Sequence, residues 1–139
     1  MTKLKFDSTA LAYMSLFERM TKAKLKDCFV DSNGVLVFVV QNGDIGKALG
    51  KHGKMAMKIT QKLNRKIKIV EYSQDLIKFI KNLILPYTVN AIEQEDDVVI
   101  LKSDDTRVKG LLIGKNGKNL RNYESIVQRY FPIKEIKVE

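Results

Sequence analysis

The chain has 139 residues, of which 45% are hydrophobic, and a formal net charge of +9. This hydrophobic content excludes a wholly disordered protein, and the single cysteine, Cys28, excludes an internal disulfide and suits a reducing compartment. No stretch approaches the roughly 20 apolar residues of a membrane-spanning helix, and residues 1–7 contain no signal-peptide core. We therefore expect a soluble, cytoplasmic protein with a polyanionic ligand.

The first half of the chain predicts a helix, two strands, two helices and a final strand. Apolar residues at helical spacing follow Ser8, a good N-cap residue, and predict a helix to about residue 24. The Asn33-Gly34 pair predicts a hairpin turn between two apolar strands, the first of which would bury Cys28. The expected elements are residues 8–24, 25–30, 35–40, 45–49, 54–64 and 66–72.

The second half repeats this order, and Pro86 ends its first helix because the residue before a proline is restricted away from the helical conformation. The expected elements are residues 74–84, 87–93, 98–102, 107–113, 118–130 and 134–138. The residues expected on the inner face of the first of these helices are Leu76, Ile77, Ile80 and Leu83. Apolar residues of the longer helices also match at an offset of 64 residues: Ala56 with Leu120, Ile59 with Tyr123, and Leu63 with Val127.

We predict an α+β protein made of two domains, residues 1–72 and 73–139, each with the order α-β-β-α-α-β. Domains of this size bury only about 60% of their unfolded surface, so we expect the two to dock. The connection at residues 71–74 contains no glycine or proline, which favours a fixed arrangement over a flexible tether. The first domain carries 14 Lys/Arg and 6 Asp/Glu, a net charge of +8, whereas the second carries 11 and 10, a net charge of +1.

A short glycine-lysine phrase occurs twice, 64 residues apart, each time between two expected helices. It reads Gly50-Lys51-His52-Gly53 in the first half and Gly114-Lys115-Asn116-Gly117 in the second. A further glycine precedes each copy by four residues, and a lysine follows each copy directly. Residues 46–58 and 110–122 are identical at five of thirteen positions, all of them glycine or lysine. One GxxG is a weak signal, but this repeated match is informative.

The phrase has the properties of a phosphate-binding turn. The first amides of a helix lack intrahelical partners and its N-terminus is positive, so a turn that opens onto a helix attracts an anion. Glycine lets another backbone come close, and lysine adds charge with a long reach. The candidate binding residues are Gly46, Lys47, Gly50, Lys51, His52, Gly53, Lys54 and Lys58 in the first half, and Arg107, Lys109, Gly110, Gly114, Lys115, Asn116, Gly117, Lys118 and Arg121 in the second.

With this element order and a GxxG between its middle helices, each half resembles a KH domain of type II. Residues 42–53 and 68–72 add a resemblance of the pair to the RNA-binding part of the NusA family of transcription factors. The resemblance implies that each GxxG clamps the backbone of about four nucleotides of single-stranded RNA. It also implies an apolar groove that holds the bases beside the edge of the sheet. The expected groove residues are Ile45, Leu49, Ile59, Leu112 and Ile113.

The resemblance further implies a factor in transcription elongation, termination or antitermination, with a nascent transcript as its RNA. A stand-alone pair of KH domains resembles the short archaeal members of the family. The chain has no room for the polymerase-binding and S1 domains of bacterial members, so RNA polymerase is the less favoured partner. Because the first half is the more basic, we expect the first glycine phrase to contribute more to general affinity.

Other functions fit the sequence less well. Three residues between Gly46 and Gly50 are too few for a P-loop, and one histidine with one cysteine cannot build a zinc site. The acid pairs at residues 96–97 and 104–105 are expected to be solvated loop charges, so we expect no catalytic residues, metal or cofactor, and no enzyme. The alternatives are a structural or assembly protein bound to ribosomal RNA, and a protein-interaction scaffold, against which the retained lysines argue.

Overall fold

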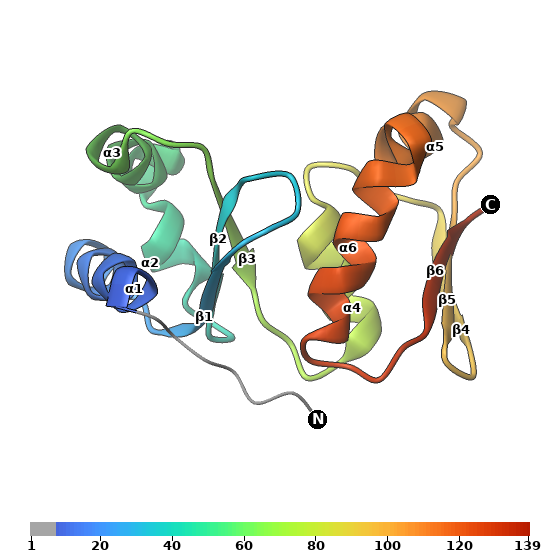
Figure 1. Ribbon diagram of the computed structural model, residues 1–139, viewed down its shortest axis with the longest axis horizontal. Coiled ribbons are helices and arrows are strands. Elements are labelled where there is room, and N and C mark those ends of the chain that lie inside the picture. Colours follow the sequence, from blue (N-terminus) through green and yellow to red (C-terminus); the bar gives the residue numbers. More distant parts are fainter. Residues whose placement is uncertain (1–7) are drawn as a thin grey trace. The chain divides into compact units, whose positions relative to one another are not determined.

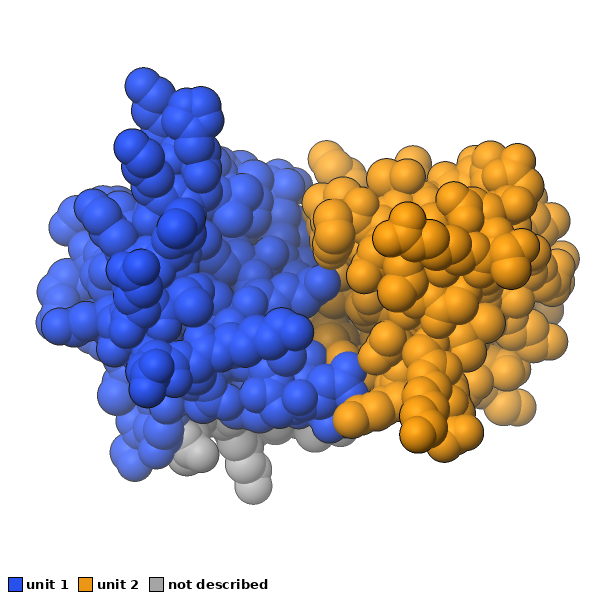
Figure 2. Space-filling model, turned by 90° about the horizontal axis from the view of Figure 1, so that it is seen from above, with its two compact units in different colours: residues 1–73 blue, residues 74–139 orange. Residues whose placement is uncertain are grey.

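The computed structural model describes residues 8–139, and the chain divides into two compact units, residues 1–73 and 74–139 (Figure 2). The expectation for residues 1–7 lies outside the described part of the chain. In each unit, helices cover one face of a three-stranded sheet, as Figure 1 shows. The predicted α+β class and the order α-β-β-α-α-β are confirmed. No helix within residues 8–139 is long and apolar enough to span a membrane.

Unit 1 runs from α1 to β3, and its sheet has β2 in the centre. The elements are α1 (Ser8–Thr21), β1 (Leu25–Val30), β2 (Leu36–Val40), α2 (Ile45–Leu49), the 3-10 turn η1 (Lys51–Gly53), α3 (Lys54–Leu63) and β3 (Ile67–Glu71). Strand β2 pairs antiparallel with β1 and parallel with β3. All five of its residues are buried, as a continuous apolar run in a central strand predicts.

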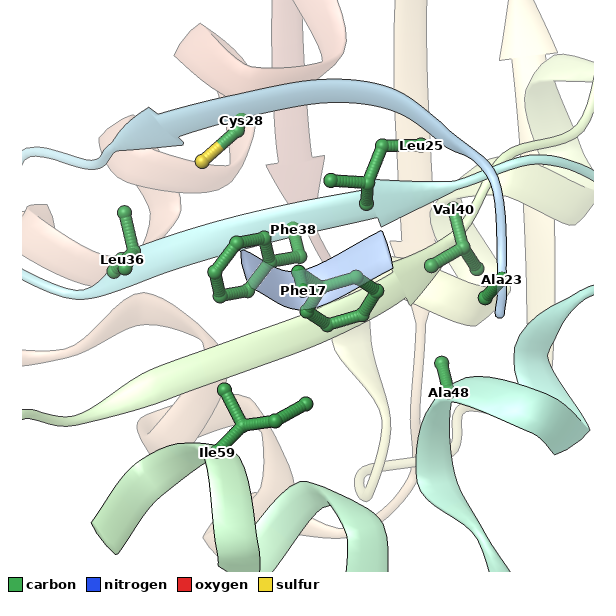
Figure 3. Packing of buried hydrophobic residues seen from close by; sticks show 9 residues of the cluster. All are labelled: Phe17, Ala23, Leu25, Cys28, Leu36, Phe38, Val40, Ala48 and Ile59. Carbon is green, nitrogen blue, oxygen red and sulfur yellow. The ribbon is translucent and has the colours of Figure 1, made fainter. Parts of the chain in front are cut away.

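The core of unit 1 forms between the helices and the sheet. Phe17 of α1 stacks on Phe38 of β2 with ring centroids 4.3 Å apart, and both side chains are fully buried. Ile59 of α3 and Cys28 of β1 belong to the same cluster (Figure 3), so the predicted burial of the cysteine is confirmed. Burying each large apolar side chain contributes about 1.5–3 kcal/mol, which holds α1 and α3 on the sheet.

Unit 2 has the same order, with β5 in the centre of its sheet. The elements are α4 (Leu76–Ile84), β4 (Ala91–Glu95), β5 (Val98–Lys102), α5 (Thr106–Ile113), the 3-10 turn η2 (Lys115–Gly117), α6 (Lys118–Gln128) and β6 (Glu135–Val138). Strand β5 pairs antiparallel with β4 and parallel with β6. Phe79 of α4 is fully buried and meets the rings of Tyr130 and Phe131 at 5.4 and 5.7 Å, which fixes α4 beside the end of α6.

Two predicted elements have a boundary that differs from the structure by three residues or more. The first helix ends at Thr21 and not at residue 24, because Lys22 adopts a left-handed φ of 63°. The strand expected at residues 87–93 lies at Ala91–Glu95. Pairing with β5 sets this position. Glu95 pairs with Val98 next to the turn, and Ala91 pairs with Lys102, the last residue of β5.

The inner faces of the helices also differ from the prediction. On α4, Phe79 and Ile84 are buried together with Ile80 and Leu83, whereas Leu76 and Ile77 are only half-buried. On α6, the buried residues are Leu120, Asn122, Ile126 and Val127, so Tyr123 is not the equivalent of the buried Ile59. Spacing indicates which residues share a face, but contact with neighbouring elements decides how that face is rotated.

Asp105, expected to be a solvated loop charge, is the N-cap of α5. Its carboxylate accepts the backbone N–H groups of Arg107 (2.9 Å) and Val108 (3.3 Å), which lack intrahelical partners. We predict that Asp105→Ala lowers the free energy of unfolding of unit 2 by about 1 kcal/mol. Asp104→Ala is the matched control, because it removes the neighbouring charge and leaves the cap intact. Equal losses in thermal denaturation of the two variants would contradict the assigned cap.

Candidate nucleic-acid interface

The two glycine phrases adopt the same backbone conformation. The opening glycines, Gly50 and Gly114, have φ and ψ of 72° and 179°, and of 73° and 176°. The third residues, His52 and Asn116, are left-handed at 56° and 30°, and at 59° and 26°. The closing glycines are left-handed as well, at 72° and 11°, and at 76° and 12°. The two turns therefore have the same conformation, although the side chain at the third position differs.

The opening glycine of each turn is required by both conformation and packing. A positive φ combined with an extended ψ is a region that essentially only glycine adopts. A Cβ at Gly50 would lie 2.7 Å from the Cβ of Met55, and one at Gly114 would lie 2.7 Å from the side chain of Asn119. Asn119 in turn donates from Nδ2 to the carbonyl oxygen of Leu111 at 3.0 Å, which ties α6 to α5.

The earlier glycines, Gly46 and Gly110, are required by neither conformation nor packing. Their φ values are not left-handed, and a Cβ built on either would meet nothing within 4 Å. Both residues are exposed, and their carbonyl oxygens accept the N–H groups of Gly50 (2.9 Å) and Gly114 (2.8 Å). The absence of a side chain at Gly46 and Gly110 leaves space in which the backbone of another molecule can approach α2 and α5.

Each turn opens directly onto the first turn of a helix. The N-caps of α3 and α6 are Gly53 and Gly117, and no side chain caps either helix. The first amides of both helices therefore have no side-chain acceptor, and the helix dipole is positive there. Gly53 and Gly117 donate to the carbonyl oxygens of Gly50 and Gly114 at 3.2 Å within the turns, so the helix dipole and the nearby lysines are what attract an anion.

The positive side chains around the first turn are exposed. Among residues 8–139, none of the following has an ion-pair partner: Lys47, Lys51, Lys54 and Lys58. Their charges are available to a polyanion, and the hydrogen-bonding ring of His52 is exposed beside them. The structure thus brings all the sequence-predicted residues of unit 1 to one helix–turn–helix segment.

The second turn is less uniform. Arg107, Lys115 and Lys118 are exposed, whereas Lys109 is half-buried. Arg121 lies on α6 one turn beyond the glycine phrase, and its Nη1 donates to both carboxylate oxygens of Glu124 at 2.9 Å. Part of its charge is therefore neutralised within unit 2, which the sequence count of basic residues did not reveal.

An apolar groove of about 320 Å³ lies in unit 1 between α2, α3 and β3. Its walls are formed by Leu49, Ala56, Met57, Thr60, Gln61, Ile67 and Ile69. Two of these side chains are exposed although they are apolar: Leu49 is 39% and Met57 is 60% exposed. Exposed apolar side chains gathered at one concave site are typical of a ligand-binding surface.

One wall of this groove is an open sheet edge, because β3 pairs only with β2 in its sheet. Leu36 donates to the carbonyl oxygen of Lys66 at 3.2 Å, and Tyr72 donates to that of Val40 at 2.8 Å. In a parallel ladder alternate residues face the neighbouring strand, so Ile67 and Ile69 direct their N–H and C=O groups to the open edge. The groove therefore offers apolar contact together with hydrogen-bonding groups.

Comparison with known families identifies this arrangement. The model of the KH-domain family matches residues 12–84. This segment runs from α1 to α4 and includes the first glycine turn. The chain belongs to the KH-domain family. KH domains are RNA-binding modules in which a GxxG loop clamps the nucleic-acid backbone, so the chain is an RNA-binding protein.

Whole-chain comparisons agree with this assignment. The chain is 38% identical to a probable transcription termination protein NusA of Methanococcus vannielii, over 98% of this chain and 80% of the relative. It is 29% identical to a protein of the same description from Thermoplasma acidophilum, over 100% of this chain and 98% of the relative. A crystal structure of a protein named APE1850 superposes with a TM-score of 0.74 at 28% identity, covering 96% of this chain and all of that one.

The predicted floor of the groove was partly wrong. Ile59 and Leu112 are fully buried in their cores and cannot meet a base, whereas Leu49 does line the groove of unit 1. Sequence reasoning missed Met57, whose signal is an apolar residue on a face of α3 that it shares with the polar residues Lys54 and Gln61. It also missed the exposed Leu111 of α5. Among residues 8–139, no three His, Cys, Asp or Glu side chains are placed to hold a metal ion.

We predict that Gly50→Ala lowers the free energy of unfolding of unit 1 by about 2–4 kcal/mol, since it adds both a clash and backbone strain. Gly53→Asn is the matched control: asparagine tolerates the left-handed region and the site has open space, so we expect a loss below about 1 kcal/mol. Chemical denaturation measures both values. Equal losses in the two variants would show that the packing of Met55 against the glycine does not constrain the turn.

Proposed function

We propose that the protein is a NusA-like factor with two type II KH domains, residues 1–72 and 73–139, which together bind single-stranded RNA. The observation that carries the proposal is the recurrence of one glycine-turn conformation, to within a few degrees, between two helices in both units. Both copies therefore present the same backbone shape to a ligand. The sugar–phosphate backbone is the group that a GxxG turn of a KH domain clamps.

In this proposal each part of the site has a distinct role. The positive N-terminal ends of α3 and α6 attract phosphate oxygens, and Lys51, Lys54, Lys115 and Lys118 supply charge along the backbone. Gly46 and Gly110 allow the RNA to approach α2 and α5. In unit 1, a base enters the groove beside Leu49 and Met57 and meets the open edge of β3. No aromatic ring lines that groove, so apolar fit and backbone hydrogen bonds take the place of stacking.

The role in transcription is supported by the relatives, several of which are described as probable transcription termination proteins. A nascent transcript is the RNA that a factor in elongation, termination or antitermination meets, and we place the protein in the cytoplasm accordingly. RNA polymerase is the less favoured partner in this proposal.

We predict that Lys51→Asp with His52→Asp, and separately Lys115→Asp with Asn116→Asp, each weaken binding to a single-stranded RNA of about eight nucleotides. The loss should be about tenfold to a hundredfold, because a charge-assisted hydrogen bond contributes about 1.5–3 kcal/mol and the aspartates also repel phosphate. Fluorescence titration of the full chain measures both affinities. The substitutions replace exposed side chains, so the fold should persist.

A matched control is Ser15→Asp with Arg19→Asp, on the exposed part of α1, which changes the net charge by the same amount outside the turns. It should reduce affinity less than either pair of turn substitutions. Titrations at several salt concentrations add a second readout, since the log–log slope becomes shallower by about 0.7 for each phosphate that is no longer neutralised. Unchanged affinity in both turn variants would eliminate the proposed clamps.

Crosslinking of the protein to RNA in cells, followed by sequencing of the RNA, tests the role in transcription. We expect reads distributed over many nascent transcripts, because the relatives are described as termination proteins. Reads confined to ribosomal RNA would replace the transcription role by one in ribosome structure or assembly. The Lys51→Asp, His52→Asp variant is the control for non-specific recovery and should lose most reads.

A further inference from the structure

Glu124 of α6 spans the space between this helix and the edge strand β6. Its side chain is only 12% exposed, and Oε2 accepts the backbone N–H of Ile136 at 2.9 Å. The same carboxylate binds Arg121 through both of its oxygens. Gln128, one helical turn further on, donates from Nε2 to the carbonyl oxygens of Ile133 and Lys134 at 3.3 Å. Side chains of α6 are thus bonded to β6 and to the segment before it.

The N–H group of Ile136 points away from the sheet. Glu139 donates to the carbonyl oxygen of Leu101 at 2.8 Å, and Ser103 donates to that of Glu139 at 2.9 Å. Odd-numbered residues of this strand therefore face β5, and Ile136 faces the open edge, because alternate residues of a parallel ladder face opposite ways. Glu124 binds a group that would otherwise be available at that edge.

Unit 1 has a different residue at the corresponding position. Thr60 lies 64 residues before Glu124, at the same distance from its glycine turn. Its hydroxyl donates to the carbonyl oxygen of Ala56 in its own helix at 3.0 Å, and it lines the open groove. The edge groups of Ile67 and Ile69 lie beside that groove. The same location is therefore open in unit 1 and occupied by a carboxylate in unit 2.

We propose that Glu124 fills the base-binding position of unit 2, so that unit 1 reads bases while unit 2 binds RNA through its phosphates alone. This proposal rests on the proposed RNA-binding function. The carboxylate takes the place of a base atom that accepts a hydrogen bond, such as a carbonyl oxygen or a ring nitrogen, and its negative charge repels phosphate. It also neutralises Arg121, which reduces the attraction of unit 2 for RNA.

The test measures unit 2 within the full chain, in a background where Lys51→Asp and His52→Asp disable the first turn. Two RNA probes of about eight nucleotides are titrated, one normal and one with abasic sites at its central positions. With Glu124 present, we expect the two probes to bind with equal affinity. With Glu124→Thr, which copies unit 1, the normal probe should bind about fivefold to tenfold more tightly than the abasic probe, the effect of about one new hydrogen bond.

Glu124→Gln separates charge from occupancy. Its amide oxygen can still accept the N–H of Ile136, but it no longer neutralises Arg121. We expect it to raise affinity for both probes equally. The reciprocal variant, Thr60→Glu in a background with Lys115→Asp and Asn116→Asp, should remove the preference of unit 1 for the normal probe. Hydrogen exchange at the Ile136 amide should be slow in the original chain and in Glu124→Gln, and faster in Glu124→Thr without RNA.

The outcomes separate this proposal from the proposed function. If the original chain binds RNA through its turns but unit 2 already prefers the normal probe to the same extent as Glu124→Thr, Glu124 does not block base reading and the proposal fails alone. Equal gains for both probes with Glu124→Thr would also overturn it, because the effect would then be electrostatic. If the original chain binds neither probe, the RNA-binding function itself fails.

Discussion

The backbone conformation at Gly50 and Gly114 is the constraint on which both candidate RNA-binding surfaces depend. A positive φ with an extended ψ changes the direction of the chain sharply at this one residue, between α2 and α3 and between α5 and α6. The reversal brings Met55 or Asn119 so close to the glycine that a Cβ would lie 2.7 Å away. The start of the following helix is thereby fixed, and with it the amides, the lysines and, in unit 1, the groove wall that carries Met57.

The turns themselves are exposed and conformationally restricted, so their shape has to be supported from elsewhere. In unit 1, Ile59 anchors α3 in the cluster around Phe17 and Phe38. In unit 2, Leu112 and Val127 hold α5 and α6 on the second core. A rigid two-layer scaffold thus keeps a glycine turn in a conformation that isolated peptides would rarely adopt. This division between scaffold and site is common in proteins whose binding residues lie on loops.

The two units share a backbone but differ in the chemistry around it. Met55 packs against its glycine through apolar contact, whereas Asn119 ties its helix to Leu111 by a hydrogen bond. Thr60 leaves a groove beside an open strand edge, whereas Glu124 bonds to that edge and to Arg121. The two units therefore share the same glycine turn and differ in the groups that lie beside the edge of the sheet.

The sequence by itself determined the element order, the α+β class and the place of both turns. These depend on local physics: the period of apolar residues, the conformations open to glycine, and the unpaired amides of a helix start. Tertiary structure decided the rest. Ile59 and Leu112 face the cores while Leu49 and Met57 stay exposed, and β4 starts at Ala91. The rotation of the helices, the strand register and the bond between Glu124 and Ile136 depend on contacts between segments that are distant in sequence. Local sequence patterns do not predict such contacts.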